Sequence, residues 1–113
     1  MAGRRLMVLT TTGARSGEAR TSPVAYTRDG DAYVVIASKG GAPTHPAWYH
    51  NLVAHPDVIV EVDGQRFEAW ATVTHGAERR RLYDAQAALM PGFAEYERRT
   101  ERVIPVVRLE RRG

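Results

Sequence analysis

The chain has 113 residues, of which 43% are hydrophobic and 26% are charged, proportions typical of one globular domain with a single core. It contains no cysteine, which excludes thiol catalysis, disulfides and cysteine-ligated metal sites. The net charge of +3 favours anionic partners, but phosphates, nucleic acids and acidic lipids would all respond to it. No apolar run approaches the roughly 20 residues of a membrane span, and the first residues make no convincing signal peptide. We therefore expect one soluble, cytoplasmic domain over residues 1–113 without stable membrane insertion; a loose association with membranes stays open.

Six stretches have the length and the apolar character of strands: residues 4–11, 21–28, 33–38, 58–62, 67–73 and 103–109. Asp29 to Asp31 separate the second stretch from the third, and Asp63 with Gly64 separate the fourth from the fifth. Asp-Gly pairs between apolar runs are strong hairpin signals. The sequence therefore predicts two hairpins.

Helices are expected between and after these strands. Thr44 or His45 is placed to cap a short helix that would hold Pro46 in its first turn. Residues 77–90 have apolar positions at helical spacing, a Pro-Gly pair interrupts the pattern, and residues 93–102 can resume it. Strands and helices do not alternate regularly, which favours an α+β fold with an antiparallel split β-barrel of about six strands over a parallel sheet.

The turn after the first predicted strand has features of an anion site. Gly13 and Gly17 allow backbone geometries that aim N–H groups at a ligand, Ser16 adds a hydroxyl, and Arg15 and Arg20 supply charge. The P-loop pattern GxxxxGK[ST] and the Rossmann pattern GxGxxG are both absent. A solvated hairpin loop with incidental arginines explains these residues about as well.

Lys39 is the only lysine among the 16 basic side chains that Lys and Arg contribute. It follows a predicted strand and precedes Gly40 and Gly41, whose small size lets a planar ligand lie close to the backbone. Trp48 is a candidate platform for such a ligand, although tryptophan is more often a core residue. We interpret this segment and the upstream turn as two halves of one anion-binding site; a plain corner in the chain is the alternative.

The histidines and the arginine clusters give weaker signals. His45, His50 and His55 are five residues apart, so successive rings on a helix would rotate by roughly 140° and could not share a face. We therefore expect no metal site. The arginines at 79–81 and 98–99 are interpreted as solvated helix faces, without the interleaved aromatic residues that a nucleic-acid surface prefers. We expect no nucleic-acid partner, and a small basic nucleic-acid-binding barrel is the weakest alternative.

Several blocks follow one another in order over nearly the whole chain: residues 9–13, 15–17, Arg20, Pro23, and residues 37–41, 46–52 and 104–105. Together they resemble the deazaflavin-dependent nitroreductase family, split β-barrel reductases that use coenzyme F420. The blocks within residues 9–20 and those within residues 37–52 each extend over more than ten residues of the chain, so the resemblance is more specific than any single motif.

The resemblance implies that the chain binds coenzyme F420, whose planar deazaflavin ring continues into a phosphodiester and a polyglutamate tail; FMN is the second choice. Arg15, Ser16, Arg20 and Lys39 would bind the phosphate and the acidic tail. The ring would lie against residues 23–25, 36–38 and 47–51. In full, the implied cofactor-binding residues are Ala14, Arg15, Ser16, Arg20, Thr21, Ser22, Pro23, Val24, Ala25, Ile36, Ala37, Ser38, Lys39, Ala47, Trp48, Tyr49, His50 and Asn51.

The activity that the resemblance implies is hydride transfer from the reduced ring to an electron-poor acceptor, as in an F420H2-dependent quinone or nitro reductase. The ring supplies the reactivity and the protein supplies position, so no acid–base pair is required. Tyr96 is the candidate proton donor, with Ser38 or solvent as rivals and a tyrosine packed at the helix surface as the plainer interpretation. Met90, Phe93 and Tyr96 would contact the acceptor. Relatives that activate nitroimidazoles carry a tyrosine-rich helix there, so the apolar Met90 and Phe93 favour a quinone.

Another class of function stays open beside the reductase. A carrier protein could bind F420 or FMN without turnover, and the sequence does not separate it from an enzyme. The expected partner of the reductase is a small-molecule acceptor, and the expected assembly is a monomer or a homodimer.

Overall fold

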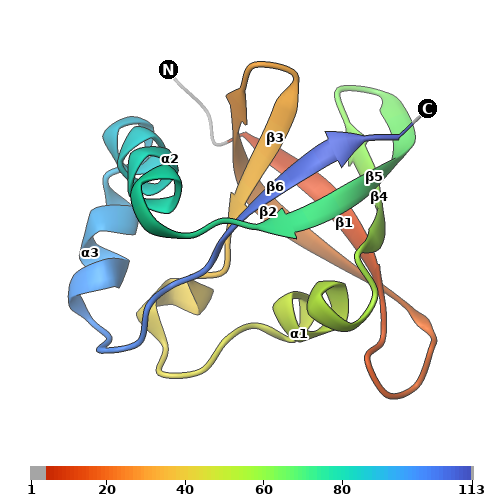
Figure 1. Ribbon diagram of the computed structural model, residues 1–113, viewed down its shortest axis with the longest axis horizontal. Coiled ribbons are helices and arrows are strands. Elements are labelled where there is room, and N and C mark those ends of the chain that lie inside the picture. Colours follow the sequence, from red (N-terminus) through yellow and green to blue (C-terminus); the bar gives the residue numbers. More distant parts are fainter. Residues whose placement is uncertain (1–4, 113) are drawn as a thin grey trace.

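The computed structural model describes residues 5–112 and folds them into a barrel with helices on one side and at one end (Figure 1). The strands are β1 (Leu6–Thr12), β2 (Ala19–Asp29), β3 (Ala32–Ile36), β4 (Asp57–Val62), β5 (Gln65–Val73) and β6 (Val106–Arg111). The helices are the short 3-10 helix η1 (Lys39–Gly41), α1 (Ala47–Ala54), α2 (Gly76–Leu89) and α3 (Gly92–Arg98).

The six strands of the described residues close into a barrel in the order β1-β2-β3-β6-β5-β4. Every pair in this ring is antiparallel, including the non-sequential pairs of β1 with β4 and of β3 with β6. Closure leaves no free sheet edge, which removes the usual route to strand aggregation. The predicted antiparallel barrel of about six strands is therefore confirmed.

Both predicted hairpins are present with two-residue turns. Asp29 pairs with Ala32 across the first turn, and Val62 pairs with Gln65 across the second. In the second turn Asp63 and Gly64 both have positive φ, 50° and 76°. Short hairpins require this left-handed backbone because it matches the twist of the strands, and it explains the Asp-Gly pair.

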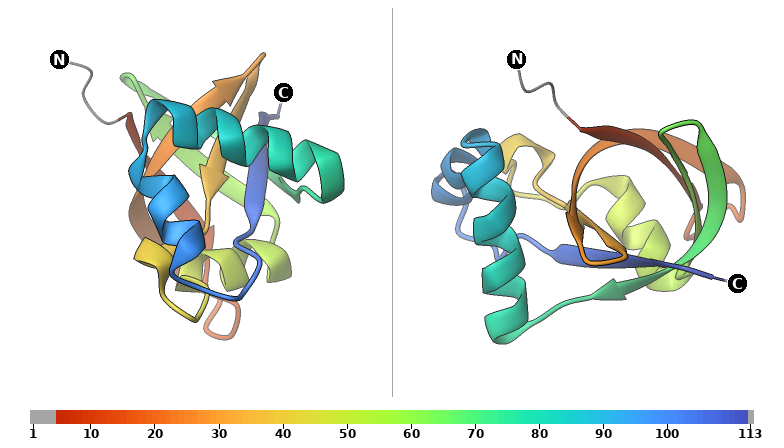
Figure 2. Two further views of the ribbon diagram at one scale, coloured as in Figure 1. Left: turned by 90° about the vertical axis from the view of Figure 1, so that its left-hand side faces the viewer. Right: turned by 90° about the horizontal axis from the view of Figure 1, so that it is seen from above.

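The core lies inside the barrel because strand residues alternate between its two faces. Met7 and Leu9 of β1 are buried, whereas Leu6 and Val8, which precede them in alternation, are exposed. Helix α1 closes one end of the barrel and contributes Leu52 to this core (Figure 2). The main cluster comprises Met7, Leu9, Val24, Tyr26, Val35, Leu52, Val58, Val60, Val62, Phe67, Ala69, Ala71, Val107 and Leu109.

A second apolar cluster holds α2 and α3 against the outside of the barrel. Val34 and Ile36 of β3 pack there with Leu82 and Tyr83 of α2 and Phe93 of α3, together with Ile104 and Val106. The two helices therefore have a fixed position relative to the end of β3. That end of β3 is where the predicted glycine-rich segment begins.

Besides shifts of one or two residues at strand and helix ends, three element boundaries differ from the sequence-based expectation. Helix α1 is capped by Pro46, with extended φ and ψ of −67° and 154°, and not by Thr44 or His45. The side chains of these two residues are used elsewhere, since Thr44 accepts a hydrogen bond from Lys39 and His45 contacts Arg102.

The other two differences lie between α3 and the last strand. Helix α3 ends at Arg98 rather than at residue 102, and β6 begins at Val106 rather than at residue 103. Pro105 has no N–H to donate to a ladder, and its carbonyl accepts from Ala37 N at 2.9 Å outside the sheet. The connecting segment is therefore irregular and is held by side-chain contacts.

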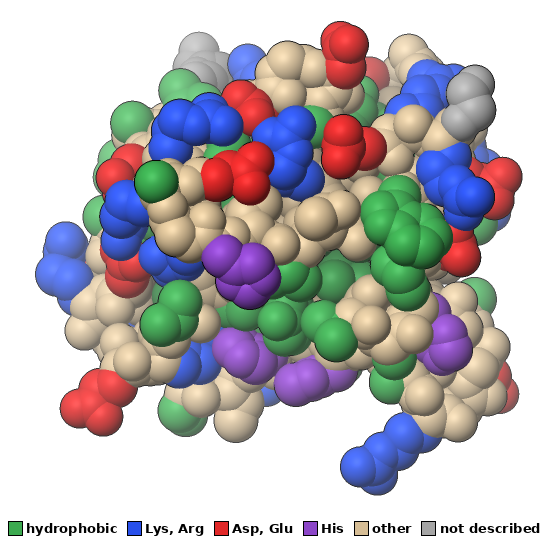
Figure 3. Space-filling view, in the orientation of Figure 1, with side chains coloured by type: hydrophobic (Ala, Val, Ile, Leu, Met, Phe, Trp, Pro, Cys, Tyr) green, Lys and Arg blue, Asp and Glu red, His purple; other side chains and the backbone are tan. Residues whose placement is uncertain are grey.

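Arg79, with 13% of its side chain exposed, departs from the predicted solvated helix face, whereas Arg80 and Arg81 are exposed as expected. Arg79 donates to the carbonyl of Ile104 through Nε and Nη2, at 3.1 and 2.9 Å. Glu97 of α3 pairs with both Arg79 and Arg80, and Arg81 pairs with Asp29 in the β2–β3 turn. Acidic and basic side chains intermingle over the upper part of the face seen in Figure 3. These contacts fix α2 to α3 and to the barrel.

Within residues 5–112, none of the helices has the length and apolar character needed to cross a bilayer.

Candidate functional site

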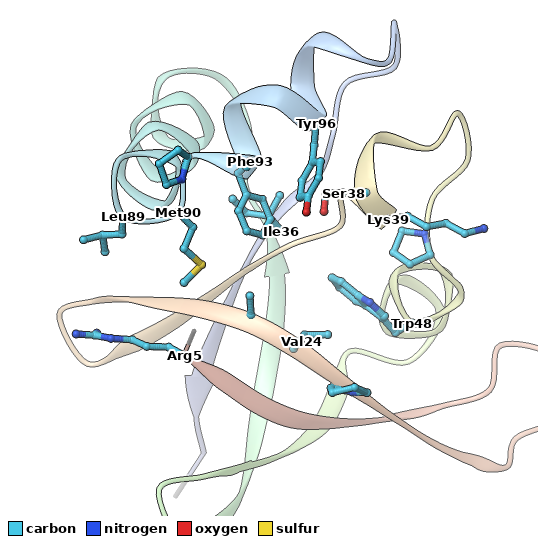
Figure 4. Close-up of a pocket in the computed structure, with 16 residues that line it drawn as sticks. Arg5, Val24, Ile36, Ser38, Lys39, Trp48, Leu89, Met90, Phe93 and Tyr96 are labelled. Carbon is cyan, nitrogen blue, oxygen red and sulfur yellow. The ribbon is translucent and has the colours of Figure 1, made fainter. Parts of the chain in front are cut away.

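A cavity of 550 Å³ lies between the barrel wall and the helices, at the end of β3 (Figure 4). Its size falls in the range of cavities that hold cofactors and other small ligands, roughly 300–1,000 Å³. The described residues that line it are Arg5, Pro23, Val24, Ala25, Ile36, Ser38, Lys39, Gly40, Pro46, Trp48, Leu89, Met90, Pro91, Gly92, Phe93 and Tyr96.

The barrel side of the cavity is a smooth apolar surface. Pro23, Val24 and Ala25 come from the middle of β2, and Ile36 ends β3. Ala25 is small and half-buried, and it packs beside the cluster under α2 and α3. A flat surface with short side chains leaves room for a planar group.

A tight left-handed turn forms the second wall. Lys39, Gly40 and Gly41 have φ values of 48°, 64° and 83°, a conformation that costs free energy for a residue with a side chain. A Cβ on Gly41 would lie 3.0 Å from the carbonyl oxygen of Tyr96 and from Cβ of Arg99. Glycine at this position thus lets α3 approach η1 closely, which narrows the cavity.

The turn between α2 and α3 forms the third wall. Phe93 and Tyr96 pack edge to face with ring centroids 5.2 Å apart. The hydroxyl of Tyr83 donates to the carbonyl of Phe93 at 2.6 Å, and burial raises the pKa of Tyr83 to about 12. Tyr83 therefore stays neutral and fixes the position of Phe93.

Two hydroxyl groups belong to the cavity lining. Figure 4 shows the side chains of Tyr96 and Ser38 both directed into the cavity, with their hydroxyl groups in the same part of it. Ser38 is 7% exposed, so its hydroxyl is largely shielded from bulk water. These are the hydroxyl groups that a ligand in the cavity would meet, in addition to the charged side chains of Arg5 and Lys39.

The charged side chains of the lining are both basic. Lys39 lies at the end near α1, where its Nζ donates to Thr44 Oγ1 at 3.2 Å (Figure 4). Arg5 lies at the opposite end, beside Leu89 and Met90. Since no acidic residue belongs to the described lining, the cavity favours an anionic or electron-rich ligand.

Ten of the predicted site residues line this cavity. They are Pro23, Val24, Ala25, Ile36, Ser38, Lys39, Trp48, Met90, Phe93 and Tyr96. They come from four separate segments of the chain, and the fold brings together the predicted ring, substrate and proton-donor residues.

The remaining predicted residues lie outside the lining. They are Ala14, Arg15, Ser16, Arg20, Thr21, Ser22, Ala37, Ala47, Tyr49, His50 and Asn51. Ala37 is fully buried, and the first six belong to the β1–β2 loop and the start of β2. That loop and η1 lie at the same end of the barrel with α1 between them (Figures 1 and 2).

Asn51 connects the β1–β2 loop to α1. Its Nδ2 donates to Thr11 Oγ1 at 3.1 Å, and its Oδ1 accepts from Ala14 N at 2.9 Å. Asn51 is 8% exposed, so both contacts are protected from solvent. The loop that carries Arg15 and Ser16 is thus held against the helix that carries Trp48.

Six lining residues are outside the predicted set of site residues: Arg5, Gly40, Pro46, Leu89, Pro91 and Gly92, although Gly40 was expected to make room for a planar ligand. Gly40 and Pro46 lie in the predicted segment around Lys39 and Trp48, so their position next to predicted site residues was a signal for including them in the predicted site. Pro91 and Gly92 were treated as a helix break, yet a break between two packed helices also exposes backbone to a cavity. Arg5 and Leu89 carry no signal in the sequence.

The histidines do not gather into a metal site. The described residues contain no group of three or more His, Asp or Glu side chains that could hold a metal ion. His45 and His50 are neighbours with ring centroids 5.7 Å apart, and Tyr49 packs against both. Burial, with Arg102 and His50 nearby, lowers the pKa of His45, so this ring is neutral at physiological pH.

Comparison with known proteins agrees with this geometry. Residues 1–111 match the family described as F420H(2)-dependent quinone reductase. A Mycobacterium tuberculosis protein named F420H(2)-dependent quinone reductase is 44% identical over 109 residues, which cover 94% of this chain and 73% of that relative.

Two solved structures with substantial sequence identity have the same fold. One, described as an F420-H2 dependent reductase, matches with a TM-score of 0.86 and 37% identity over 95% of each chain. Another, described as a domain-swapped dimer, matches with a TM-score of 0.87 and 36% identity over 96% of this chain and 82% of that chain. The expected fold, the oxidoreductase class and the cofactor are confirmed together, and the chain belongs to the F420H(2)-dependent quinone reductase family.

Proposed function

We propose that the chain holds reduced coenzyme F420 in the cavity at the end of β3 and uses it to reduce a quinone. The observation that carries this proposal is the lining itself, which joins a flat apolar slot to a basic end at Lys39. A deazaflavin ring with an anionic tail requires both features in one site. The residues present therefore fit the group that the family uses.

The ring would lie between the β2 surface and Trp48. Pro23 and Ala25 offer short side chains on one side, and Trp48 offers a large aromatic face at the edge of α1. Packing of this kind fixes the plane of the ring without covalent contact. Orientation of two reactants is worth several kcal/mol of barrier and can replace specific acid–base catalysis.

The phosphate and tail would leave the cavity past Lys39 toward the β1–β2 loop. Arg15, Ser16 and Arg20 are exposed there and stand outside the cavity lining, so they would meet the tail and not the ring. The contact between Asn51 and the backbone of Ala14 keeps this loop against α1. An acidic tail along this path would have positive charge on both sides of α1.

The reduced ring supplies a hydride, and the quinone becomes a quinol once it has gained that hydride and a proton. Met90 and Phe93 would hold the flat, apolar acceptor against the ring. Tyr96 and Ser38 both line the cavity, so either hydroxyl could donate to a quinone oxygen and pass on the proton. Tyr96→Phe and Ser38→Ala would separate their roles in turnover.

The test is a parallel titration of the purified protein with F420 and FMN, followed by tryptophan fluorescence, and then mixing of the reduced complex with menadione. We expect selective binding of F420 and loss of the reduced coenzyme's absorbance only after menadione is added. Binding without turnover would favour a carrier. Selective binding of FMN, or no binding of either, would contradict the proposal.

Assembly is a separate question. A relative with 36% identity is described as a domain-swapped dimer, and on that basis we extend the proposal to a homodimer of this chain. Light scattering across a range of protein concentrations would reveal the mass, and a monomer at every concentration would contradict the dimer.

A further inference from the structure

Arg102 lies in the irregular segment between α3 and β6, with its guanidinium turned into the protein. Its Nε donates to the carbonyl of Ala42 at 2.8 Å, and Nη2 donates to the carbonyl of Ser38 at 2.7 Å. Its Nη1 donates to the carbonyl of Ala37 at 3.2 Å and to Nδ1 of His45 at 2.8 Å. One side chain therefore satisfies four acceptors that are spread over nine residues of the chain.

These contacts are unusual for an arginine because no carboxylate of the described residues forms an ion pair with it. The planar guanidinium presents five N–H groups in a fixed fork, which a lysine does not reproduce. Here the fork is used on carbonyls that lie beyond the last ladder bond of β3. Arg102 thus binds the backbone carbonyls of Ala37, Ser38 and Ala42.

The backbone that it holds is the wall of the cavity. Ser38 and Ala42 flank the three left-handed residues of η1, and two of the guanidinium contacts bracket this turn on either side. The left-handed conformation of Lys39 is disfavoured and persists only where its surroundings fix it. His45 stands immediately before Pro46 and α1, so its contact with Arg102 also positions the helix that presents Trp48.

We propose that Arg102 is the positioning residue of the cofactor cavity: its four hydrogen bonds hold the β3–η1–α1 segment in the conformation that brings Ser38, Lys39 and Trp48 to the ligand. The role in ligand binding rests on the proposed function, whereas the role in holding the segment does not. Arg102 does not line the cavity, and it acts only through the backbone that it binds.

The contact with His45 determines the state of that ring. Since Arg102 only donates, Nδ1 of His45 must accept, and its proton is then on Nε2. The other neighbours of the ring are His50 and Tyr49 of α1. A second proton on His45 would remove the acceptor and place a positive charge against the guanidinium.

The test compares Arg102→Lys, which keeps the charge and loses the fork, with Arg108→Lys as the matched control. Arg108 is also a largely buried arginine, with 20% of its side chain exposed, but it pairs with Asp29 and Glu78 away from the cavity. The first readout is hydrogen exchange of the ligand-free protein. Gly41 N and Ala42 N donate to Ser38 and Lys39, so these amides are protected only while the turn is intact.

We expect Arg102→Lys to accelerate exchange across residues 37–48 while Arg108→Lys leaves these amides unchanged. In the second readout, Arg102→Lys should raise the dissociation constant for F420 by about tenfold, as expected for lost hydrogen bonds to a charged donor. Arg108→Lys should leave the dissociation constant within about twofold, because Arg108 forms its ion pairs with Asp29 and Glu78, which do not line the cavity. Arg102→Ala should also weaken F420 binding. Low concentrations of guanidinium should restore part of this affinity, because the ion can occupy the space that the side chain vacates.

Unchanged exchange in Arg102→Lys, or an affinity loss no larger than in Arg108→Lys, would overturn the proposal. If the wild-type protein bound no F420, the proposed function would fail instead, and exchange at residues 37–48 would still decide whether Arg102 holds the segment. Faster hydrogen exchange in Arg102→Lys with unchanged F420 affinity would also contradict the proposed role of Arg102 in ligand binding, since the cavity would then not depend on residues 37–48.

Discussion

At the scale of single residues, the cavity depends on a few side chains whose surroundings determine their charge. Lys39 is exposed and bound to Thr44, so its ammonium is available to an anion at the cavity edge. His45 is half-buried against Arg102, and this environment favours its neutral form. Lys39 therefore permits a test of a positive charge in ligand binding, and His45 permits a test of a neutral ring in protein stability.

Lys39→Ala should weaken F420 binding by about tenfold, since charge-assisted hydrogen bonds are roughly twice as strong as neutral ones. Lys39→Arg should retain most of the affinity, and added salt should narrow the difference between wild type and Lys39→Ala. Fluorescence titrations at two ionic strengths would measure this. Equal affinity for wild type and Lys39→Ala would place the tail elsewhere.

We expect the protein to become less stable as the pH is lowered, because of His45. Its pKa in the folded protein is lower than in the unfolded chain, so between the two values only the unfolded chain binds the proton. The stabilising effect of the neutral ring is therefore complete above about pH 6.5 and is lost as the pH falls toward the folded pKa.

His45→Asn keeps an acceptor near the position of Nδ1 and does not titrate. We expect its free energy of unfolding to depend less on pH than that of wild type between about pH 7 and pH 5, where an unperturbed histidine gains its proton. Urea unfolding at several pH values would compare them. Parallel curves for the two proteins would exclude His45 as the titrating group.

At the scale of elements, the cavity is a gap left where α2 and α3 pack beside η1 and the barrel. Tyr83 joins α2 to α3 through the carbonyl of Phe93, and Glu97 of α3 pairs with two arginines of α2. These contacts hold the two helices together, and the distance of the pair from η1 sets the width of the cavity. Gly41 lies where η1 comes close to α3, since a Cβ there would be 3.0 Å from the carbonyl oxygen of Tyr96.

Gly41→Ala should widen this gap. Its Cβ would meet backbone of α3 at 3.0 Å, which must shift, and its φ of 83° adds strain. Gly64→Ala is the matched control, because Gly64 has a φ of 76° but open space around it. Both should lose about 1–2 kcal/mol from the left-handed conformation, and only Gly41→Ala should lose F420 affinity as well.

Urea unfolding and F420 titration of both variants would separate strain from displacement. If both variants bound F420 like the wild type, the contact of η1 with α3 would have no part in shaping the cavity.

At the scale of the whole molecule, the closed barrel and the packed helices form a preformed site, so binding should stabilise the protein without a large rearrangement. A ligand that binds only the folded state stabilises it by about 2.7 kcal/mol at one hundred times its dissociation constant. We expect F420 to raise the melting temperature in proportion to the logarithm of its concentration, and FMN to raise it less at equal concentration. Differential scanning fluorimetry would measure both, and an equal or larger shift with FMN would contradict the choice of cofactor.

Much of this architecture is determined by local sequence. The Asp-Gly turns at residues 29–31 and 63–64 require a left-handed backbone that few other residues adopt, so both hairpins are evident without a structure. Alternation of apolar residues identifies the strands, and helical spacing identifies α2. The ordered blocks around Lys39 and Trp48 also identify the family, and through it the cofactor.

The tertiary structure alone decided which of these residues share the cavity. Arg5 and Leu89 lie 84 positions apart and line the same cavity only because α2 packs against the end of β2, where Gln86 contacts Thr27 and Arg81 pairs with Asp29. Arg102, in a stretch expected to be helical, instead binds carbonyls some 60 to 65 positions earlier in the chain. Local patterns report the conformation that a segment prefers, because they depend on backbone geometry and burial within a few residues. Contacts between distant segments depend on how the elements pack, and that free energy is distributed over the whole core.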